Sequence, residues 1–160
     1  MTAPGTDGLP LFRQAVQDDW IDYNGHLSEA YYVLVFGFAT DALMEAVGLG
    51  QGYREDTGCS LYTVEAHVRY LSEVPRGSHL CVRTTVLGAD TRKVRLLHEM
   101  FLTGLSGGPE GSAVATEELF ALHVDRDSGR SGPLPGAVQT GLGALVAPGP
   151  DWTGRGIREI

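Results

Sequence analysis

The stretch Asp18–Gly50, DDWIDYNGHLSEAYYVLVFGFATDALMEAVGLG, decides the fold of this 160-residue chain. It begins with a polar, turn-forming segment, residues 22–26, and continues into a long apolar run with the composition of a helix. Residues 30–40 contain no charged side chain, whereas a surface helix normally has one polar face. This uncharged run is too short to span a bilayer. We therefore predict an enclosed helix that is covered by a sheet of the same protein.

The ends of this helix are marked by residues that favour helix termini. Ser28 is a favoured N-cap residue, and Gly48 and Gly50 predict the C-terminal end. Before the helix, Asn24-Gly25 is a strong turn signal. We expect the helix to begin just after Ser28 and to end at Gly48.

Composition and charge narrow the class of protein. The chain is 42% hydrophobic and 20% charged, which is ordinary for one globular domain. Its net charge of −8 argues against nucleic acid or an anionic membrane as a partner. The N-terminus, MTAPGTDGLP, lacks the features of a signal peptide. We therefore expect a cytoplasmic protein in which Cys59 and Cys81 are reduced thiols.

After the helix, the apolar period changes to two, which is typical of strands. In residues 61–70, the apolar face consists of Tyr62, Val64, Ala66, Val68 and Tyr70, and the polar face of Thr63, Glu65, His67 and Arg69. The other expected elements are a first strand at 11–16, a polar loop at 51–58, further strands at 80–87, 93–102 and 112–125, and a short helix near 138–146. The alternation falters at residues 116–118, where a bulge would fit.

The order of these elements is a strand, a turn, a buried helix and four meandering antiparallel strands. It predicts an α+β protein with the hot-dog fold, in which a curled antiparallel sheet wraps around a long central helix. Such a sheet leaves edge strands that need a cover. We therefore expect it to be completed as a homodimer or as a dimer of dimers.

The first place for chemistry is the helix entrance, residues 22–27. A helix N-terminus offers unpaired N–H groups and a positive dipole end, and Gly25 lets a ligand approach the backbone closely. These groups could stabilise an oxyanion, with Asp22 as general base or nucleophile. The alternative is that Asp22 and Asn24 only cap and turn the chain.

Two further groups of polar residues are weaker candidates. Glu65 and His67 point to the same side of a strand, where they could orient water or a substrate group, or form a solvated face with Arg69. The five histidines lack the spacing of a metal site, so we predict no metal and no cofactor. His98 is in register with apolar residues of its strand, which predicts a hydrogen-bonded core histidine.

Aromatic residues are concentrated around the start of the helix. Trp20, Tyr23, Tyr31, Tyr32 and Phe36 lie within a short segment. Packing in the core explains some of them, but Trp20 and Tyr23 precede the helix and could line an acyl pocket. An aromatic box beside a carboxylate suits a quaternary ammonium group.

Together, these residues resemble a known enzyme family. Asp22, Gly25 and His26 in an Asp-x-x-Gly-His motif, a Tyr-containing apolar helix and a four-strand meander resemble the acyl-CoA thioesterases of the 4-hydroxybenzoyl-CoA thioesterase type. Three stretches look like the betainyl-CoA thioesterases of bacterial carnitine breakdown. They are VQDDWIDYNGHLSEAYYVLVFGFATDALMEAVGL, SLYTVEAHVRYLSEV and Gly154-Arg155-Gly156-Ile157. The resemblance implies a hot-dog thioesterase domain at 10–127, between a disordered leader (1–9) and a Gly/Pro-rich extension (128–160) packed on it.

The resemblance also implies an activity and its residues. It implies hydrolysis of a small acyl-CoA thioester, with betainyl-CoA giving betaine and CoA. The family's active carboxylate corresponds to Asp22, and its oxyanion site to the amides near Gly25–Leu27. The remaining expected catalytic residues are Asn24, His26 and Glu65, and the expected substrate contacts are Trp20, Tyr23, Tyr31, His67, Arg92 and Lys93. Arg92 and Lys93, which lie beside Arg95, or Arg69 and Arg76 would meet the CoA phosphates.

Two other functions are compatible with the same pattern. One is a non-catalytic acyl-CoA-binding or regulatory module, because a fold does not determine a function. The other is a hot-dog hydratase or dehydratase, which also places a carboxylate or a histidine near this helix entrance.

Overall fold

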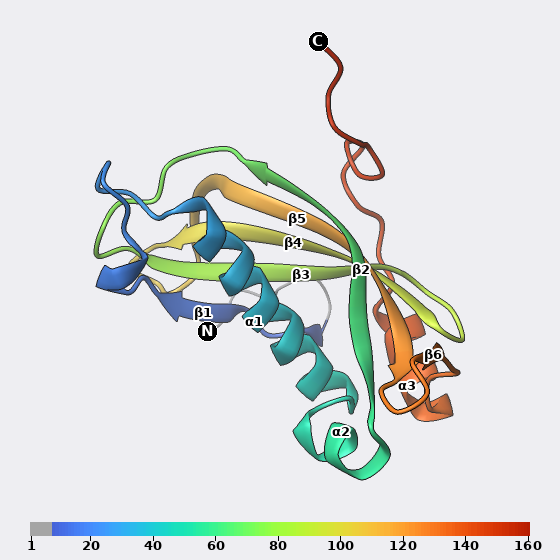
Figure 1. Cartoon of the computed structure of the whole chain (residues 1–160). Coiled ribbons are helices and arrows are strands. Elements are labelled where there is room, and N and C mark those ends of the chain that lie inside the picture. Colours follow the sequence, from blue (N-terminus) through green and yellow to red (C-terminus); the bar gives the residue numbers. More distant parts are fainter. Residues whose placement is uncertain (1–7) are drawn as a thin grey trace. The chain divides into compact units, whose positions relative to one another are not determined.

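The computed structural model of the chain describes residues 8–160 (Figure 1). Residues 1–7 of the expected leader lie outside this described part. The elements follow the chain in the order β1 (Phe12–Ala15), η2 (Asp18–Trp20), α1 (Glu29–Val47), α2 (Gln51–Thr57), β2 (Cys59–Tyr70), β3 (His79–Ala89), β4 (Lys93–Thr103), β5 (Pro109–Asp125), β6 (Arg130–Ser131) and α3 (Gly136–Leu145). The predicted central helix, the predicted strands and the predicted short C-terminal helix are therefore confirmed.

The strands are joined by hydrogen bonds in the order β1-β3-β4-β5-β2, and the short β6 pairs with β5. β1 and β3 are antiparallel, with Phe12 opposite Val82 and Ala15 opposite His79. β2 comes last in this order, beside β5 rather than β3, so the expected four-strand meander is wrong for β2, which is an edge strand. One sheet accompanied by a long helix agrees with the predicted α+β class.

Two compact units interleave along the chain. Unit 1 consists of the segments Met1–Thr40, Val68–Thr84 and His98–Glu117, and unit 2 of Asp41–His67, Thr85–Leu97 and Glu118–Ile160. Each unit thus combines part of α1 with parts of several strands.

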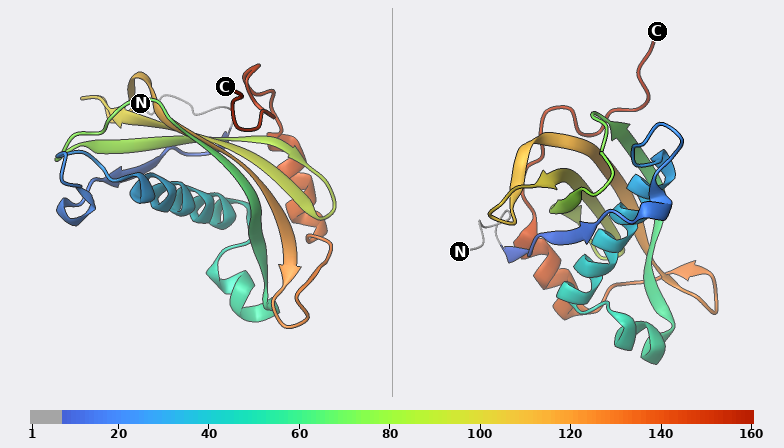
Figure 2. Two further views of the ribbon diagram at one scale, coloured as in Figure 1. Left: turned by 45° about the horizontal axis from the view of Figure 1, so that its top comes forward. Right: turned by 90° about the vertical axis from the view of Figure 1, so that its left-hand side faces the viewer.

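The core of unit 1 forms where the first half of α1 packs against strands. The buried members are Leu27, Tyr32, Val35, Phe36, Ala39, Val74, Leu80, Val82, Met100, Val114 and Ala115. The helical members are spaced three or four residues apart, so they form one face of α1. Figure 2 shows this helix running alongside the strands. Burial of this apolar face drives the packing of α1.

The opposite face of α1 remains open to solvent in the single chain. Val33 is 42% exposed and Leu34 is 38% exposed. The prediction of complete enclosure is therefore wrong for this face, because only one side of α1 meets the strands of its own chain. By length (19 residues) and mean hydropathy (1.3), α1 could also cross a membrane. Its buried side chains instead belong to the protein core.

His98 connects α1 to the sheet in unit 1. Its side chain is fully buried, with Nε2 2.8 Å from the hydroxyl of Thr40 on α1 and Nδ1 2.8 Å from the hydroxyl of Thr84 on β3. The ring of Phe36 stacks on it with centroids 5.9 Å apart. Burial lowers the pKa of His98 to about 3, so the ring is neutral at pH 7. The predicted core histidine is confirmed.

The expected loop at residues 51–58 is instead the helix α2, and several contacts explain the error. The N–H of Gln51 donates to a carboxylate oxygen of Glu45 (2.8 Å), and the Gln51 amide donates to Glu55 one turn later (2.7 Å). Gly58 ends the helix with a left-handed φ of 71°. The hydroxyl of Tyr53 lies 2.7 Å from Nε2 of His123 on β5. Tertiary contacts stabilise a short polar helix that has no apolar periodicity.

The C-terminal part of the chain packs within unit 2. α3 buries Val138 and Leu142, and the N–H of Ala147 donates to the carbonyl of Val86 on β3 (2.9 Å). Figure 2 shows α3 beside the end of this strand. The segment from Gly149 to Gly156, which we call the strap, follows.

Candidate functional site

The helix entrance is a tight turn whose shape follows from its sequence. The N–H of Gly25 donates to the carbonyl of Asp22 (3.0 Å), and the N–H of Asp22 donates to the carbonyl of His26 (2.9 Å). Gly25 has a φ of 81°, which a residue with a side chain rarely adopts. The turn brings the carboxylate of Asp22 close to the start of α1.

The carboxylate of Asp22 stabilises the turn and also lines a cleft. Its Oδ1 accepts the N–H of Asn24 (2.8 Å), which is the turn-stabilising role of aspartate. The same side chain also lines a cleft. One carboxylate oxygen is therefore used by the turn, and the catalytic role of Asp22 stays a prediction.

The cleft beside Asp22 measures about 460 Å³. Its lining consists of Asp22, Asn24, His26, Leu27, Glu29, Tyr32, Tyr70, Leu71, Ser72 and Glu73. Three of these side chains are carboxylates, and none is a lysine or an arginine. The cleft is therefore strongly acidic and suits a cationic group of a ligand.

The side chains of His26 and Glu73 lie close together at the rim of this cleft. Nε2 of His26 lies 3.3 Å from a carboxylate oxygen of Glu73. The side chain of Glu73 is 76% exposed, so water screens its charge. The contact between His26 and Glu73 therefore contributes little to the stability of the fold.

Tyr32 and Tyr70 form the aromatic wall of the cleft. Their rings meet edge to face, with centroids 5.2 Å apart. The hydroxyl of Tyr32 donates to the carbonyl of Ser72 (3.2 Å), and that of Tyr70 donates to the carbonyl of Glu29 (3.4 Å). Burial raises the pKa of both phenols, so both are neutral at pH 7. Because both hydroxyl protons are already used in hydrogen bonds, the rings are the parts of these side chains that can contact a ligand.

The aromatic box expected from Trp20, Tyr23 and Tyr31 is not assembled around this cleft. Trp20 stacks on Tyr31 with centroids 5.5 Å apart, and both pack against the core of unit 1. The side chain of Tyr23 is 97% exposed. Tyr70, at the end of β2, lines the cleft in their place. The sequence alone gave no reason to bring this distant residue to the helix entrance.

The backbone donors expected from Gly25 and Leu27 are already in use. The N–H of Gly25 bonds to Asp22, and the N–H of Leu27 donates to the carbonyl of Val74 (2.8 Å). A helix leaves its first N–H groups without intrahelical partners. At the start of α1, these groups belong to Glu29 and Ala30. The N–H groups without an intrahelical partner therefore lie slightly further along the chain than the amides at which we expected an oxyanion site.

Glu65 and His67 line a second pocket, which lies within unit 2. It measures about 360 Å³ and is also bordered by Arg95, Glu118, Phe120 and the strap. Asp22 and His26 line the first cleft, so the two sets of sequence-predicted residues belong to different pockets of the chain. The expected roles of Glu65 and His67 stay predictions.

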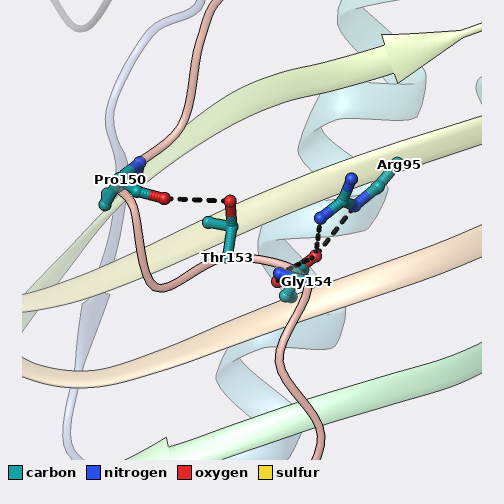
Figure 3. A network of polar contacts seen from close by, with 5 residues as sticks. Arg95, Pro150, Thr153 and Gly154 are labelled. Carbon is teal, nitrogen blue, oxygen red and sulfur yellow. Dashed lines mark hydrogen bonds and ion pairs between the residues drawn. The ribbon is translucent and has the colours of Figure 1, made fainter.

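The strap is held at this second pocket by one carboxylate (Figure 3). The N–H of Gly154 donates to both oxygens of Glu118 (2.6 and 3.1 Å), and Arg95 forms an ion pair with the same carboxylate. Thr153 folds back so that its hydroxyl donates to the carbonyl of Pro150 (2.9 Å). Gly154 has a φ of 79°, and a Cβ there would lie 3.2 Å from the Arg95 guanidinium. The left-handed φ and this close approach both favour glycine.

Most of the basic residues considered for the CoA phosphates have partners within the chain. Arg95 pairs with Glu118, Arg76 pairs with Asp18 (2.9 Å), and Arg69 donates to the Thr116 hydroxyl (3.2 Å). The side chains of Arg92 and Lys93 are exposed at the β3–β4 hairpin. Their N–H groups both donate to Asp90 (2.8 Å each), which lowers the pKa of that carboxyl. Their role as phosphate contacts stays a prediction.

Sequence reasoning missed Glu117 on β5. Its side chain is only 5% exposed, and burial raises its pKa to about 7. The signal was the break in alternation at residues 116–118, for which we expected a bulge. The strand continues through these residues, with residues 114–117 all buried. The irregular pattern therefore coincides with a buried carboxylate, and the expected bulge stays a prediction.

Comparisons with known proteins identify the family. Residues 16–142 match the thioesterase-like superfamily. A betainyl-CoA thioesterase of Pseudomonas aeruginosa is 40% identical, and the match covers 93% of this chain and 94% of that protein. An L-carnitine dehydrogenase/betainyl-CoA thioesterase of Agrobacterium fabrum is 42% identical over 95% of this chain, which spans 31% of that longer protein.

Solved structures confirm the fold. A Staphylococcus aureus protein of hypothetical function, solved in complex with CoA, superposes with a TM-score of 0.81 at 22% identity and 94% coverage of both chains. A candidate thioesterase from Pseudomonas putida superposes with a TM-score of 0.77 at 36% identity, covering 96% of this chain and 99% of that one. Since the sequence match spans most of the chain and the architecture agrees with these structures, the chain is a hot-dog-fold member of the thioesterase-like superfamily of acyl-CoA thioesterases.

Proposed function

We propose that this protein hydrolyses betainyl-CoA to betaine and CoA in carnitine catabolism. The observation that carries the proposal is the cleft beside Asp22, which is acidic and has two tyrosine rings in its wall. A trimethylammonium group is attracted both by carboxylates and by aromatic faces. Two relatives of more than 39% identity are named for the same activity.

We assign the chemical step to Asp22 as general base. Its free oxygen takes a proton from water, and the resulting hydroxide attacks the thioester carbonyl carbon. The N–H groups of Glu29 and Ala30 at the first turn of α1 stabilise the oxyanion that forms. The intermediate collapses with cleavage of the C–S bond, and protonated Asp22 returns its proton to the departing CoA thiolate. Asn24 lines the same cleft and holds the water.

The remaining parts of the proposal concern CoA and the assembly. Arg92 and Lys93 meet the CoA phosphates, because their side chains are exposed at the hairpin. The edge strand β2 exposes Tyr62 (42%) and Val64 (53%). Pairing of this edge with a second copy would cover its apolar face, which supports a homodimer. Both cysteines are free, which supports a cytoplasmic location.

A thiol-release assay with several acyl-CoA substrates tests the activity. We expect betainyl-CoA to be cleaved faster than acetyl-CoA or a long-chain acyl-CoA. Binding of acyl-CoA without release of thiol would identify a non-catalytic module. Hydration of an enoyl-CoA would identify a hydratase.

The variant Asp22→Asn tests the mechanism. It keeps an oxygen that can accept the N–H of Asn24, so we expect normal folding. Loss of a general base typically costs about 10²- to 10⁴-fold in rate. Glu110→Gln is the matched control, because Glu110 is an exposed carboxylate outside this cleft. Near-wild-type turnover by Asp22→Asn would contradict the assignment.

A further inference from the structure

Glu117 is a buried carboxylate on β5. Its side chain is 5% exposed, and none of the ion pairs formed among residues 8–160 includes it. Buried carboxylates normally have cations or several hydrogen-bond donors around them.

The pleat of the strands shows which way Glu117 points. Arg69 on β2 donates to the hydroxyl of Thr116 on β5 (3.2 Å), so these two side chains share one face of the sheet. Successive side chains of a strand alternate between faces. Their neighbours Tyr70 and Glu117 therefore share the other face. This is the α1 face, because the hydroxyl of Tyr70 donates to the carbonyl of Glu29.

Glu117 and Tyr70 also interact electrostatically. The carboxylate contributes to the raised pKa of the Tyr70 phenol. Tyr70 in turn lines the cleft beside Asp22. The negative charge of Glu117 therefore acts on the aromatic wall at which we place the acyl group.

We propose that Glu117 is the buried counter-charge that selects a cationic acyl group bound against the ring of Tyr70. This inference rests on the proposed function and names the residue that determines its substrate class. Glu117 is a specificity-determining residue, and the bond cleavage belongs to Asp22.

Because Glu117 is buried, it distinguishes cationic from neutral acyl groups better than the exposed carboxylates of the cleft do. Glu73 is 76% exposed, so solvent weakens its attraction for a ligand. Charges interact more strongly where water is excluded. Burial raises the pKa of Glu117 to about 7, and a permanent cation nearby favours its ionised form. A neutral acyl group would provide no such compensation.

A pair of substrates with the same shape isolates the effect of charge. Betainyl-CoA is compared with 3,3-dimethylbutanoyl-CoA, in which carbon replaces the ammonium nitrogen. The ratio of their kcat/KM values is measured for the wild-type protein, for Glu117→Gln and for Glu110→Gln. Glu110 is an exposed carboxylate at the start of the same strand, so it controls for the change in net charge.

We expect Glu117→Gln to lower the betainyl-CoA/3,3-dimethylbutanoyl-CoA ratio about 10- to 100-fold, as expected for one charge pair in a partly desolvated site. The loss should come mainly from kcat/KM for betainyl-CoA, with kcat/KM for the neutral substrate nearly unchanged. Glu110→Gln should keep the wild-type ratio. Far-UV circular dichroism of each variant verifies that it is folded.

The outcomes separate the inference from the proposed function. If the wild-type protein shows no preference for betainyl-CoA, the proposed function is wrong. If it prefers betainyl-CoA and Glu117→Gln retains that preference, the proposed function stands and the role of Glu117 is refuted. An equal loss of activity on both substrates would also refute it, because it would indicate a structural role.

Discussion

Replacing Glu117 with glutamine should stabilise the protein at alkaline pH. In the folded chain, burial raises the pKa of Glu117 from 4.5 to about 7. Between these two values, the folded state keeps a proton that the unfolded chain has released. The free energy of unfolding therefore falls as the pH rises through this window. Glutamine is uncharged at every pH and removes this dependence.

The magnitude follows from the difference between the two pKa values. That difference, with about 1.4 kcal/mol for each pH unit, corresponds to a cost of about 3 kcal/mol above pH 8. At pH 5 most of the cost is absent, and less than about 1 kcal/mol of it applies. Relative to wild type, Glu117→Gln should gain about 2–3 kcal/mol between pH 5 and pH 8.5, or roughly 5–10 °C in Tm.

Urea unfolding measures this difference at pH 5, 7 and 8.5, with ionic strength and protein concentration held constant. Glu110→Gln serves as the control and should follow the wild-type pH dependence. If the curves of wild type and Glu117→Gln stay parallel over this range, Glu117 does not bear a destabilising buried charge. A more stable variant that also loses its preference for the cationic substrate would show that the chain retains Glu117 at the expense of stability.

Two further variants test other parts of the structure. Glu118→Gln weakens the hydrogen bonds that the carboxylate accepts from Gly154 and Arg95. It should destabilise the strap by about 1–3 kcal/mol. Proteolytic removal of the C-terminal segment, followed by mass spectrometry, should therefore become faster. Unchanged proteolysis would mean that other contacts hold the strap. Val64→Glu places a charge on the exposed apolar face of β2 and should convert the proposed dimer to a monomer in light-scattering measurements, whereas Thr63→Glu, on the other face, should not. A monomeric wild-type protein would contradict the dimer.

Local sequence signals determined the main elements of the fold. The uncharged run at residues 30–40 and the flanking Ser28 and Gly48 predicted α1 almost to the residue, because capping and hydrophobic burial act over short distances. The strict alternation in β2 likewise predicted a strand. The turn residues around Asp22 placed a carboxylate at the helix entrance, where the structure has it.

Tertiary packing decided the features that depend on distant contacts. α2 has no apolar periodicity and forms because Glu45 caps it and Tyr53 reaches His123. Tyr70 enters the wall of the cleft because β2 ends beside the start of α1. Such contacts join residues far apart in sequence, so no local pattern predicts them.

Glu117 shows most clearly the difference between what the sequence determines and what only tertiary packing decides. The sequence by itself determined that the pattern of β5 breaks near residues 116–118. It did not determine whether the irregularity is a bulge in the backbone or a charge in the interior, because both interrupt the same alternation. In the structure, residues 114–117 are all buried within β5, so the carboxylate of Glu117 lies in the interior. The physical reason is that burial depends on what packs against a residue, whereas alternation depends only on its neighbours in the chain.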